Sequence, residues 1–104
     1  MVLIHIICDS PKQANEIVDF LIDEKLMLNP FLSHKTLYKP KKNGEEKSFE
    51  QTLVMGTTKA LLFNTINKTI KKRFAKNPPL TYAMPIIYMD EHQNLELQTK
   101  TQKV

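Results

Sequence analysis

The stretch Val2-Leu3-Ile4-His5-Ile6-Ile7-Cys8-Asp9-Ser10-Pro11-Lys12-Gln13 decides how the chain begins to fold. Its first seven residues are apolar at both parities, apart from His5, which is typical of a strand buried on both faces. Ser10 can cap a helix, Pro11 suits the first helical position, and Gln13 can reach back to the cap. We therefore expect a buried strand followed at once by a helix, whose apolar face consists of Ala14, Ile17, Val18, Leu21 and Ile22.

Three further strands are predicted downstream, two of them joined by a hairpin. Residues 32–38 and 47–56 form the hairpin strands, and Asn43-Gly44 between them is a strong signal for a tight turn. Residues 81–90 form the last strand. Pro85 within it requires an edge position or a bulge, because proline donates no ladder hydrogen bond.

A second helix precedes the last strand, and a polar tail follows it. Thr57 or Thr58 can cap this helix, whose predicted inward stripe is Leu62, Phe63, Ile66, Ile70 and Phe74. The tail, residues 91–104, is mostly polar. Leu95 and Leu97 allow it a short extra strand, and we expect the rest to be frayed.

The order of elements is β-α-β-β-α-β, and the fold class is α+β. Two β-α-β units joined by a hairpin give a ferredoxin-like antiparallel sheet, with the first and third strands central and both helices on one face. The length of 104 residues fits a single domain over residues 1–104. The other face of the sheet should be polar in a monomer, yet the first and fourth strands are apolar at both parities. We expect that face to be buried by oligomerisation; the alternative is that the tail folds back over it.

Composition excludes several classes of protein. The single cysteine, Cys8, excludes an internal disulfide framework and suits a reducing compartment. The opening apolar run lacks a basic region and a cleavage site, and it is too short to span a bilayer, so we expect a cytoplasmic protein without membrane contact. The net charge of +4 allows anionic partners without specifying one.

The reactive side chains form no catalytic constellation in the sequence. There is no Gly-x-Ser-x-Gly elbow and no phosphate-binding glycine loop, so we do not expect an enzyme. Cys8 precedes a helix N-terminus, which favours a thiolate and a metal-binding role; a buried apolar cysteine is the alternative. His5 lies three residues away, hence on the opposite face of a strand. A closed zinc site within one chain therefore lacks ligands, and a site shared between subunits stays open.

Basic residues gather in the second predicted helix. Lys68, Lys71 and Lys72 lie on its outer face, and no acidic residue nearby in the sequence offsets them. They can hold an anionic ligand; a solvated helix face is the alternative. The third strand lacks the aromatic signature that nucleic-acid modules of this fold place on the open sheet, so nucleic acid is not an expected partner.

Several local strings fall in the same order as in a known family: Cys8-Asp9-Ser10-Pro11, Ala14, Glu24-Lys25-Leu26, Tyr38, Glu50, Leu53, Thr57 and Pro78. With this order of elements, the chain from about Leu3 to Asp90 resembles the CutA1 family, the divalent-cation tolerance proteins. The resemblance implies a non-enzymatic homotrimer with its sheets facing inward. It also implies a role in binding divalent cations such as copper or zinc.

The chain departs from the family pattern at places that bear on the metal. Pro40 stands where the family usually has tryptophan, and Asn77-Pro78-Pro79-Leu80-Thr81-Tyr82-Ala83 lacks the histidine and glutamate of the corresponding family string. Of the residues associated with copper, only Cys8 carries over, so a metal there would need ligands from a neighbouring subunit. The alternative resemblance is to the related PII signalling proteins, which bind nucleotide at subunit clefts. The tight Asn43-Gly44 turn argues against their long signalling loop.

Overall fold

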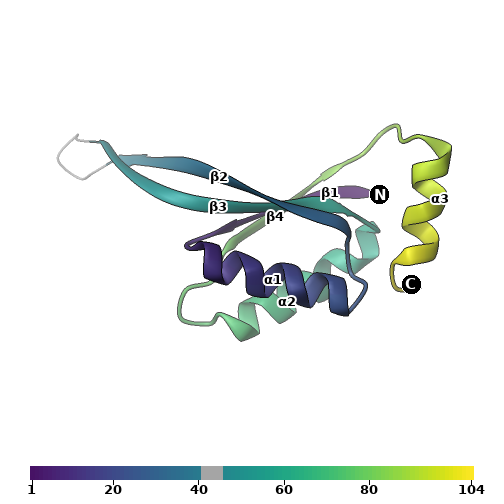
Figure 1. Ribbon diagram of the computed structural model, residues 1–104, viewed down its shortest axis with the longest axis horizontal. Helices are drawn as coiled ribbons and strands as arrows, with labels where there is room; N and C mark the ends of the chain where they lie inside the picture. The colour runs from purple at the N-terminus through teal and green to yellow at the C-terminus, as the bar shows by residue number, and fades with distance from the viewer. Residues whose placement is uncertain (41–45) are drawn as a thin grey trace.

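The computed structural model describes residues 1–40 and 46–104, with only the backbone of residues 39, 40, 46 and 47 (Figure 1). The asparagine–glycine turn predicted at residues 43 and 44 lies outside the described residues. The elements are β1 (Val2–Cys8), α1 (Pro11–Asp23), β2 (Leu28–Pro40), β3 (Glu46–Thr58), the 3₁₀ turn η1 (Ala60–Leu62), α2 (Phe63–Arg73), β4 (Leu80–Pro85) and α3 (Glu91–Lys100). The four strands form one antiparallel sheet in the order β2-β3-β1-β4. The predicted ferredoxin-like arrangement is confirmed, with β1 and β3 central and β4 at an edge.

The start of α1 forms as the sequence predicts. Ser10 Oγ accepts a hydrogen bond of 3.1 Å from the backbone N–H of Gln13. The Gln13 side chain in turn accepts one of 3.0 Å from the N–H of Asp9. Pro11 occupies the first turn of the helix. These two reciprocal bonds satisfy donors that a helix end otherwise leaves open, and they fix the angle at which α1 leaves β1.

Helices α1 and α2 lie side by side against one face of the sheet (Figure 1). The core between the two layers takes Ile4 and Ile6 from β1, Ile17 and Leu21 from α1, and Leu62, Ile66 and Ile70 from η1 and α2. Phe63 and Phe74 are partly buried against this core, so the predicted stripe of the second helix is confirmed. Burying each large apolar side chain contributes about 1.5–3 kcal/mol, which makes this layer the main source of stability.

The second helix does not begin at a threonine cap, so that prediction was wrong. Thr58 is the last residue of β3, and its hydroxyl donates to the carbonyl oxygen of Leu26 in the loop after α1. The chain turns through η1 first, after Lys59, which makes no side-chain cap. Thr58 is buried, and an internal partner for its hydroxyl takes precedence over capping.

Strand bounds also differ from the sequence expectation. β2 begins at Leu28, and a register shift between Leu28 and Phe31 accompanies a left-handed Asn29, whose φ is 48°. β4 ends at Pro85 rather than at residue 90, because proline cannot continue the ladder. The next N–H, of Ile86, donates to the carbonyl of Met1 instead. Beyond the end of β1, the paired β2 and β3 project as a two-stranded ribbon (Figure 1).

The tail is a helix, which corrects the expectation of a short strand or a frayed end. The Asp90 carboxylate accepts hydrogen bonds from the N–H groups of His92 and Gln93, and so caps α3. Leu97 is fully buried. After the helix, the N–H of Gln102 donates to the Lys25 carbonyl over 2.9 Å. A polar helix is stable here because Asp90 caps its start, Leu97 is buried, and Gln102 after its end bonds to the loop that follows α1.

Helix α3 stands at one end of the sheet and does not cover the open face (Figure 1). It meets the sheet where β1 begins, and Gln93 and Glu96 share a hollow there with Leu3 and Thr57. The alternative, that the tail folds back over the sheet, therefore holds only at this end. No helix within the described residues is long and apolar enough to cross a bilayer.

Candidate functional site

Cys8, the predicted metal ligand, lies on the helix-covered side of the sheet. It shares the buried parity of β1 with Ile4 and Ile6, and its side chain has no exposed surface. Burial, and secondarily the charge of Asp9, raises the pKa of the Cys8 thiol to about 12. The thiol is therefore protonated at neutral pH, and desolvation outweighs the helix N-terminus that favoured a thiolate in the sequence.

The surroundings of Cys8 do not fit copper or zinc. Within the described residues, no three side chains of the histidine, cysteine, aspartate or glutamate type gather in a way that could hold a metal ion. His5 lies on the opposite side of β1, as its spacing predicted. Because Cys8 is enclosed by the helix layer, a subunit that covered the open face could not add ligands to it. A metal site at Cys8 would need a deprotonated sulfur and further ligands, and the described residues supply neither at neutral pH.

The predicted anion-binding residues lie together on the surface of α2. Lys68, Lys71 and Lys72 are exposed on its outer side, and no ion pair joins them to a carboxylate within the described residues. The neighbouring Arg73 lies over the ring of Phe20, 5.3 Å from its centroid, and shares a hollow with four acidic residues of α1 and its end: Glu16, Asp19, Asp23 and Glu24. The basic surface of α2 therefore borders an acidic surface on α1. The two are far apart in the sequence, so only the structure shows that they are neighbours.

The open face of the sheet carries a broad exposed apolar surface. Phe31, Leu80, Tyr82 and Met84 are 54, 58, 45 and 40 % exposed. They stand on the same side as Leu3, His5 and Ile7 of β1, whose partners in β4 are Met84, Tyr82 and Leu80. Single exposed apolar residues are ordinary, whereas several large exposed apolar side chains on one sheet face are typical of an interaction surface.

A polar pair interrupts this apolar surface at its centre. His5 Nδ1 lies 3.1 Å from the Tyr82 hydroxyl, and the two rings are 5.2 Å apart between centroids. His5 Nε2 is buried and has no hydrogen-bond partner within the described part of the chain. Beside the pair lies a hollow of about 280 Å³, which Ile7, Leu53 and Lys35 also line. The sequence could not reveal this site, because it depends on the register of β1 against β3 and β4.

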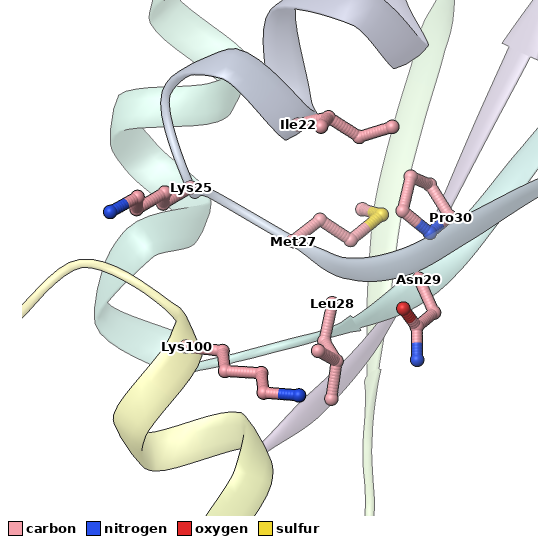
Figure 2. Close-up of a pocket in the computed structure, with 7 residues that line it drawn as sticks. All are labelled: Ile22, Lys25, Met27, Leu28, Asn29, Pro30 and Lys100. Carbon is pink, nitrogen blue, oxygen red and sulfur yellow. The ribbon is translucent and has the colours of Figure 1, made fainter.

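A larger hollow, of about 440 Å³, lies between the end of α1 and the end of α3 (Figure 2). Met27, Leu28, Pro30 and Ile22 supply apolar walls, and Lys25, Asn29 and Lys100 supply polar groups. In Figure 2 the Lys25 amino group points away from Met27 and Pro30, while the Lys100 side chain extends towards Leu28. Lys100 is already paired with Glu96 at 3.1 Å. This hollow therefore offers little unpaired charge to a ligand. The hollow is lined by the left-handed residues Lys25 and Asn29 and by Lys100 of α3. The sequence pattern predicted neither the left-handed conformations nor this helix.

Comparison with solved structures identifies the fold, whereas comparison by sequence finds no relative. A scan against protein-family models and a sequence search of curated proteins found no match. Among solved structures, the periplasmic divalent cation tolerance protein CutA from Archaeoglobus fulgidus has a TM-score of 0.85 at 16% identity, over 98% of this chain and 100% of that one. The divalent cation tolerance protein from Thermus thermophilus has a TM-score of 0.82 at 21% identity, over 98% and 100% of the two chains. CutA1 from Oryza sativa has a TM-score of 0.86 at 14% identity, over 99% and 94%.

These likenesses extend over nearly the whole of each chain. They therefore include α3, the element that sequence reasoning misjudged, as well as the ferredoxin-like part. Identities of this size establish the architecture and leave the chemistry of individual side chains to be argued from this chain. The protein has the fold of the CutA1 divalent cation tolerance proteins.

Proposed function

We propose that this chain is the subunit of a cytoplasmic, non-enzymatic CutA1-like homotrimer that takes part in tolerance of divalent cations. The observation that carries the proposal is the exposed apolar face of the sheet, which includes Phe31, Leu80, Tyr82 and Met84. Identical subunits cover such a face more simply than a separate partner does, because each subunit exposes the same apolar area and can bury it against the others. The CutA1 fold supports the same reading.

The magnitude of this exposed surface favours a stable assembly. Complete burial of one large apolar side chain contributes about 1.5–3 kcal/mol, and a standard interface takes about 800 Å² from each partner. Four large, half-exposed side chains on one face, with Leu3 and Ile7 between them, supply the apolar centre that such an interface needs.

A charge placed on the open face should separate the subunits. Met84→Glu puts a carboxylate within the proposed interface, on the edge strand β4, whereas Leu61→Glu, at a side chain that is 74 % exposed in η1, serves as the matched control. We expect sedimentation to show a trimer for the wild type and for Leu61→Glu, and a folded monomer for Met84→Glu. Equal trimers in all three would mean that another surface holds the assembly.

Cation tolerance can be tested in a bacterial host that lacks its own CutA1 protein and is grown on raised copper or zinc. We expect the wild type and Leu61→Glu to improve growth, and the monomeric Met84→Glu variant to fail. The cation would act on the assembled protein through groups other than the Cys8 thiol, since that thiol is protonated and enclosed. No improvement by the wild type would remove the tolerance role.

The second candidate is a PII-like regulatory role, in which subunit clefts hold an anionic small molecule such as a nucleotide. The specific observation in its favour is the exposed trio Lys68, Lys71 and Lys72, which makes no ion pair within the described residues. Thermal shifts across a nucleotide panel test it. A shift that disappears in a Lys68→Ala, Lys71→Ala, Lys72→Ala variant would support this role, and flat curves for the wild type would remove it.

A further inference from the structure

Helix α3 buries little of its own surface. It has ten residues, fewer than the about 12–15 that an isolated helix needs in water. Leu95 and Leu97 are two positions apart and therefore point in different directions, so Leu97 is buried while Leu95 is 59 % exposed. Thr101, just after the helix, is also buried, and its hydroxyl donates to the Leu97 carbonyl over 2.7 Å. With so little packing, the helix depends on what holds its two ends.

The C-terminal end of α3 is held by hydrogen bonds that converge on Gln102. The N–H of Gln102 donates to the Lys25 carbonyl over 2.9 Å, and its side-chain amide donates to the Glu24 carbonyl over 2.6 Å. The Lys59 ammonium group donates to the Gln102 carbonyl over 2.7 Å. Lys59 thus places a positive charge at the end of the helix that favours a cation. We call the bonds of Lys59 and Gln102 the latch.

The N-terminal end of α3 is joined to the sheet by an exposed segment. Residues 86–90 connect β4 to α3 without a helix or strand, and Ile87 and Tyr88 in this segment are 82 and 92 % exposed (Figure 1). Asp90 caps the helix, but its two bonds to backbone N–H groups stay within α3. A segment with so few buried contacts can change its backbone angles at little cost, so it can act as a hinge.

The face of α3 that meets the sheet borders unfilled space. Gln93, Glu96 and Lys100 recur three and four positions apart, on one side of the helix. Gln93 and Glu96 line the hollow of about 340 Å³, and Lys100 lines the one of about 440 Å³. Leu28 and Asn29, at the start of β2, line both hollows, and Figure 2 shows Lys100 extending towards Leu28. Atoms that border such space lack contacts on that side, so α3 is loosely packed here.

We propose that α3 is a strap, which opens as a unit about residues 86–90 and is held closed by the latch. On opening, the carbonyls of the latch exchange their partners for water, which costs little because Glu24 and Lys25 are exposed residues. Leu97 leaves its buried position, and the two hollows join into one groove along the start of β2. The strap thereby controls access to this groove. The device belongs to a single chain and does not depend on the proposed trimer.

Hydrogen exchange of the wild-type protein in low concentrations of urea tests whether α3 opens by itself. Local opening exposes little surface, so its free energy hardly depends on urea, whereas the free energy of global unfolding depends on it steeply. We expect the N–H groups of residues 95–100 to exchange at a rate that urea barely changes. Those of β1 should exchange more slowly and respond steeply. Equal rates and equal urea dependence in α3 and β1 would overturn the proposal.

Lys59→Met tests the latch, because it keeps a long side chain and removes the charged donor. We expect exchange in α3 to become at least about tenfold faster, as for the loss of a hydrogen bond to a charged group, with β1 unchanged. Lys100→Met is the matched control. It removes an exposed ion pair with Glu96, and we expect a change of less than about threefold. Equal effects of the two variants, or faster exchange throughout the domain in Lys59→Met, would overturn the proposal.

A thiol at position 97 reports the opening directly. In a Cys8→Ala background, Leu97→Cys places a thiol at the buried position of α3, and Ile6→Cys places one in the core as a reference. We expect a thiol reagent to modify Leu97→Cys faster than Ile6→Cys, and Lys59→Met to accelerate only the first. Equal rates at both positions would overturn the strap and leave the proposed trimer standing. A monomeric protein in which α3 opens alone would remove the trimer and support the strap.

Discussion

The two faces of this sheet are built from alternate residues of the same strands, yet their surroundings differ completely. On β1, Ile4, Ile6 and Cys8 are fully buried beneath α1 and α2, whereas Leu3, His5 and Ile7 face the open side. Both sets are largely apolar. The apolar composition of the strands therefore does not distinguish the covered face of the sheet from the open one; the number of helices available to cover the sheet does.

Adjacent isoleucines give the sharpest form of this comparison. Ile6→Ala removes a fully buried side chain, and we expect it to lower the free energy of unfolding by about 2–5 kcal/mol, because a cavity is left in the core. Ile7→Ala should cost the isolated subunit much less and should weaken assembly instead. Urea unfolding and dilution experiments on both variants check this. Equal loss of unfolding free energy in the two would contradict the distinction between the faces.

Gly56 tests how tightly the covered face is filled. A Cβ at this position would lie 2.6 Å from Met27 Sδ and 3.3 Å from Pro30 Cα. We expect Gly56→Ala to destabilise the domain by about 1–3 kcal/mol through overpacking, as measured by urea unfolding. The double variant Gly56→Ala, Met27→Ala makes room for the added methyl group. The double variant should therefore lose less than the sum of the two single effects; strict additivity would mean that the methionine is not the obstacle.

Cys8 tests how completely water is excluded from the helix-covered face of the sheet. Burial raises the pKa of its thiol from the ordinary 9.0 to about 12, so the unfolded chain loses this proton first as the pH rises. Stability is therefore unaffected by this group below about pH 9 and falls from there towards about pH 12, by up to about 1.4 kcal/mol per pH unit.

The comparison variant for this effect is Cys8→Ala, which lacks the thiol and should show a shallower loss. Urea midpoints at about pH 8 and about pH 10, on either side of the ordinary thiol pKa, supply the measurement. Parallel losses in the two proteins would show that Cys8 is accessible to water. The same variant should bind Cu²⁺ and Zn²⁺ as the wild type does, and a selective loss of binding would restore Cys8 as a metal ligand.

The smallest effect concerns α3, which closes one end of the open face. Asp90→Ala removes the carboxylate that accepts from His92 and Gln93, and we expect a loss of about 1 kcal/mol. Hydrogen exchange should show the loss mainly in α3, while β1 and β3 keep their protection. Uniformly faster exchange would mean that α3 is part of one cooperative unit with the sheet.

The sequence supported most of the fold because local signals and periodicity agreed. The capping pair Ser10 and Gln13, the stripe of α2 and the edge position of Pro85 were all predictable from short-range chemistry. Helix α3 was not predicted, because the spacing of Leu95 and Leu97 favoured a strand and Asp90 was assigned to the end of the last strand. Thr58 misled for a related reason: its hydroxyl finds a tertiary partner, Leu26, that no sequence window contains.

The candidate site was less predictable than the fold. Cys8 looked available beside a helix N-terminus, but its exposure depends on which side of β1 the helices cover. The basic surface of α2 looked unopposed until α1 was placed beside it. The pair His5 and Tyr82 joins residues 77 positions apart, so only strand register reveals it.

The molar mass of the wild-type protein in solution, measured by light scattering over a wide range of concentration, tests the central claim most directly. If other copies of the chain cover the open face, the mass is three times the 12.1 kDa of one chain. A protein that remains at 12.1 kDa at every concentration, with Phe31, Leu80 and Tyr82 in water, would contradict the account.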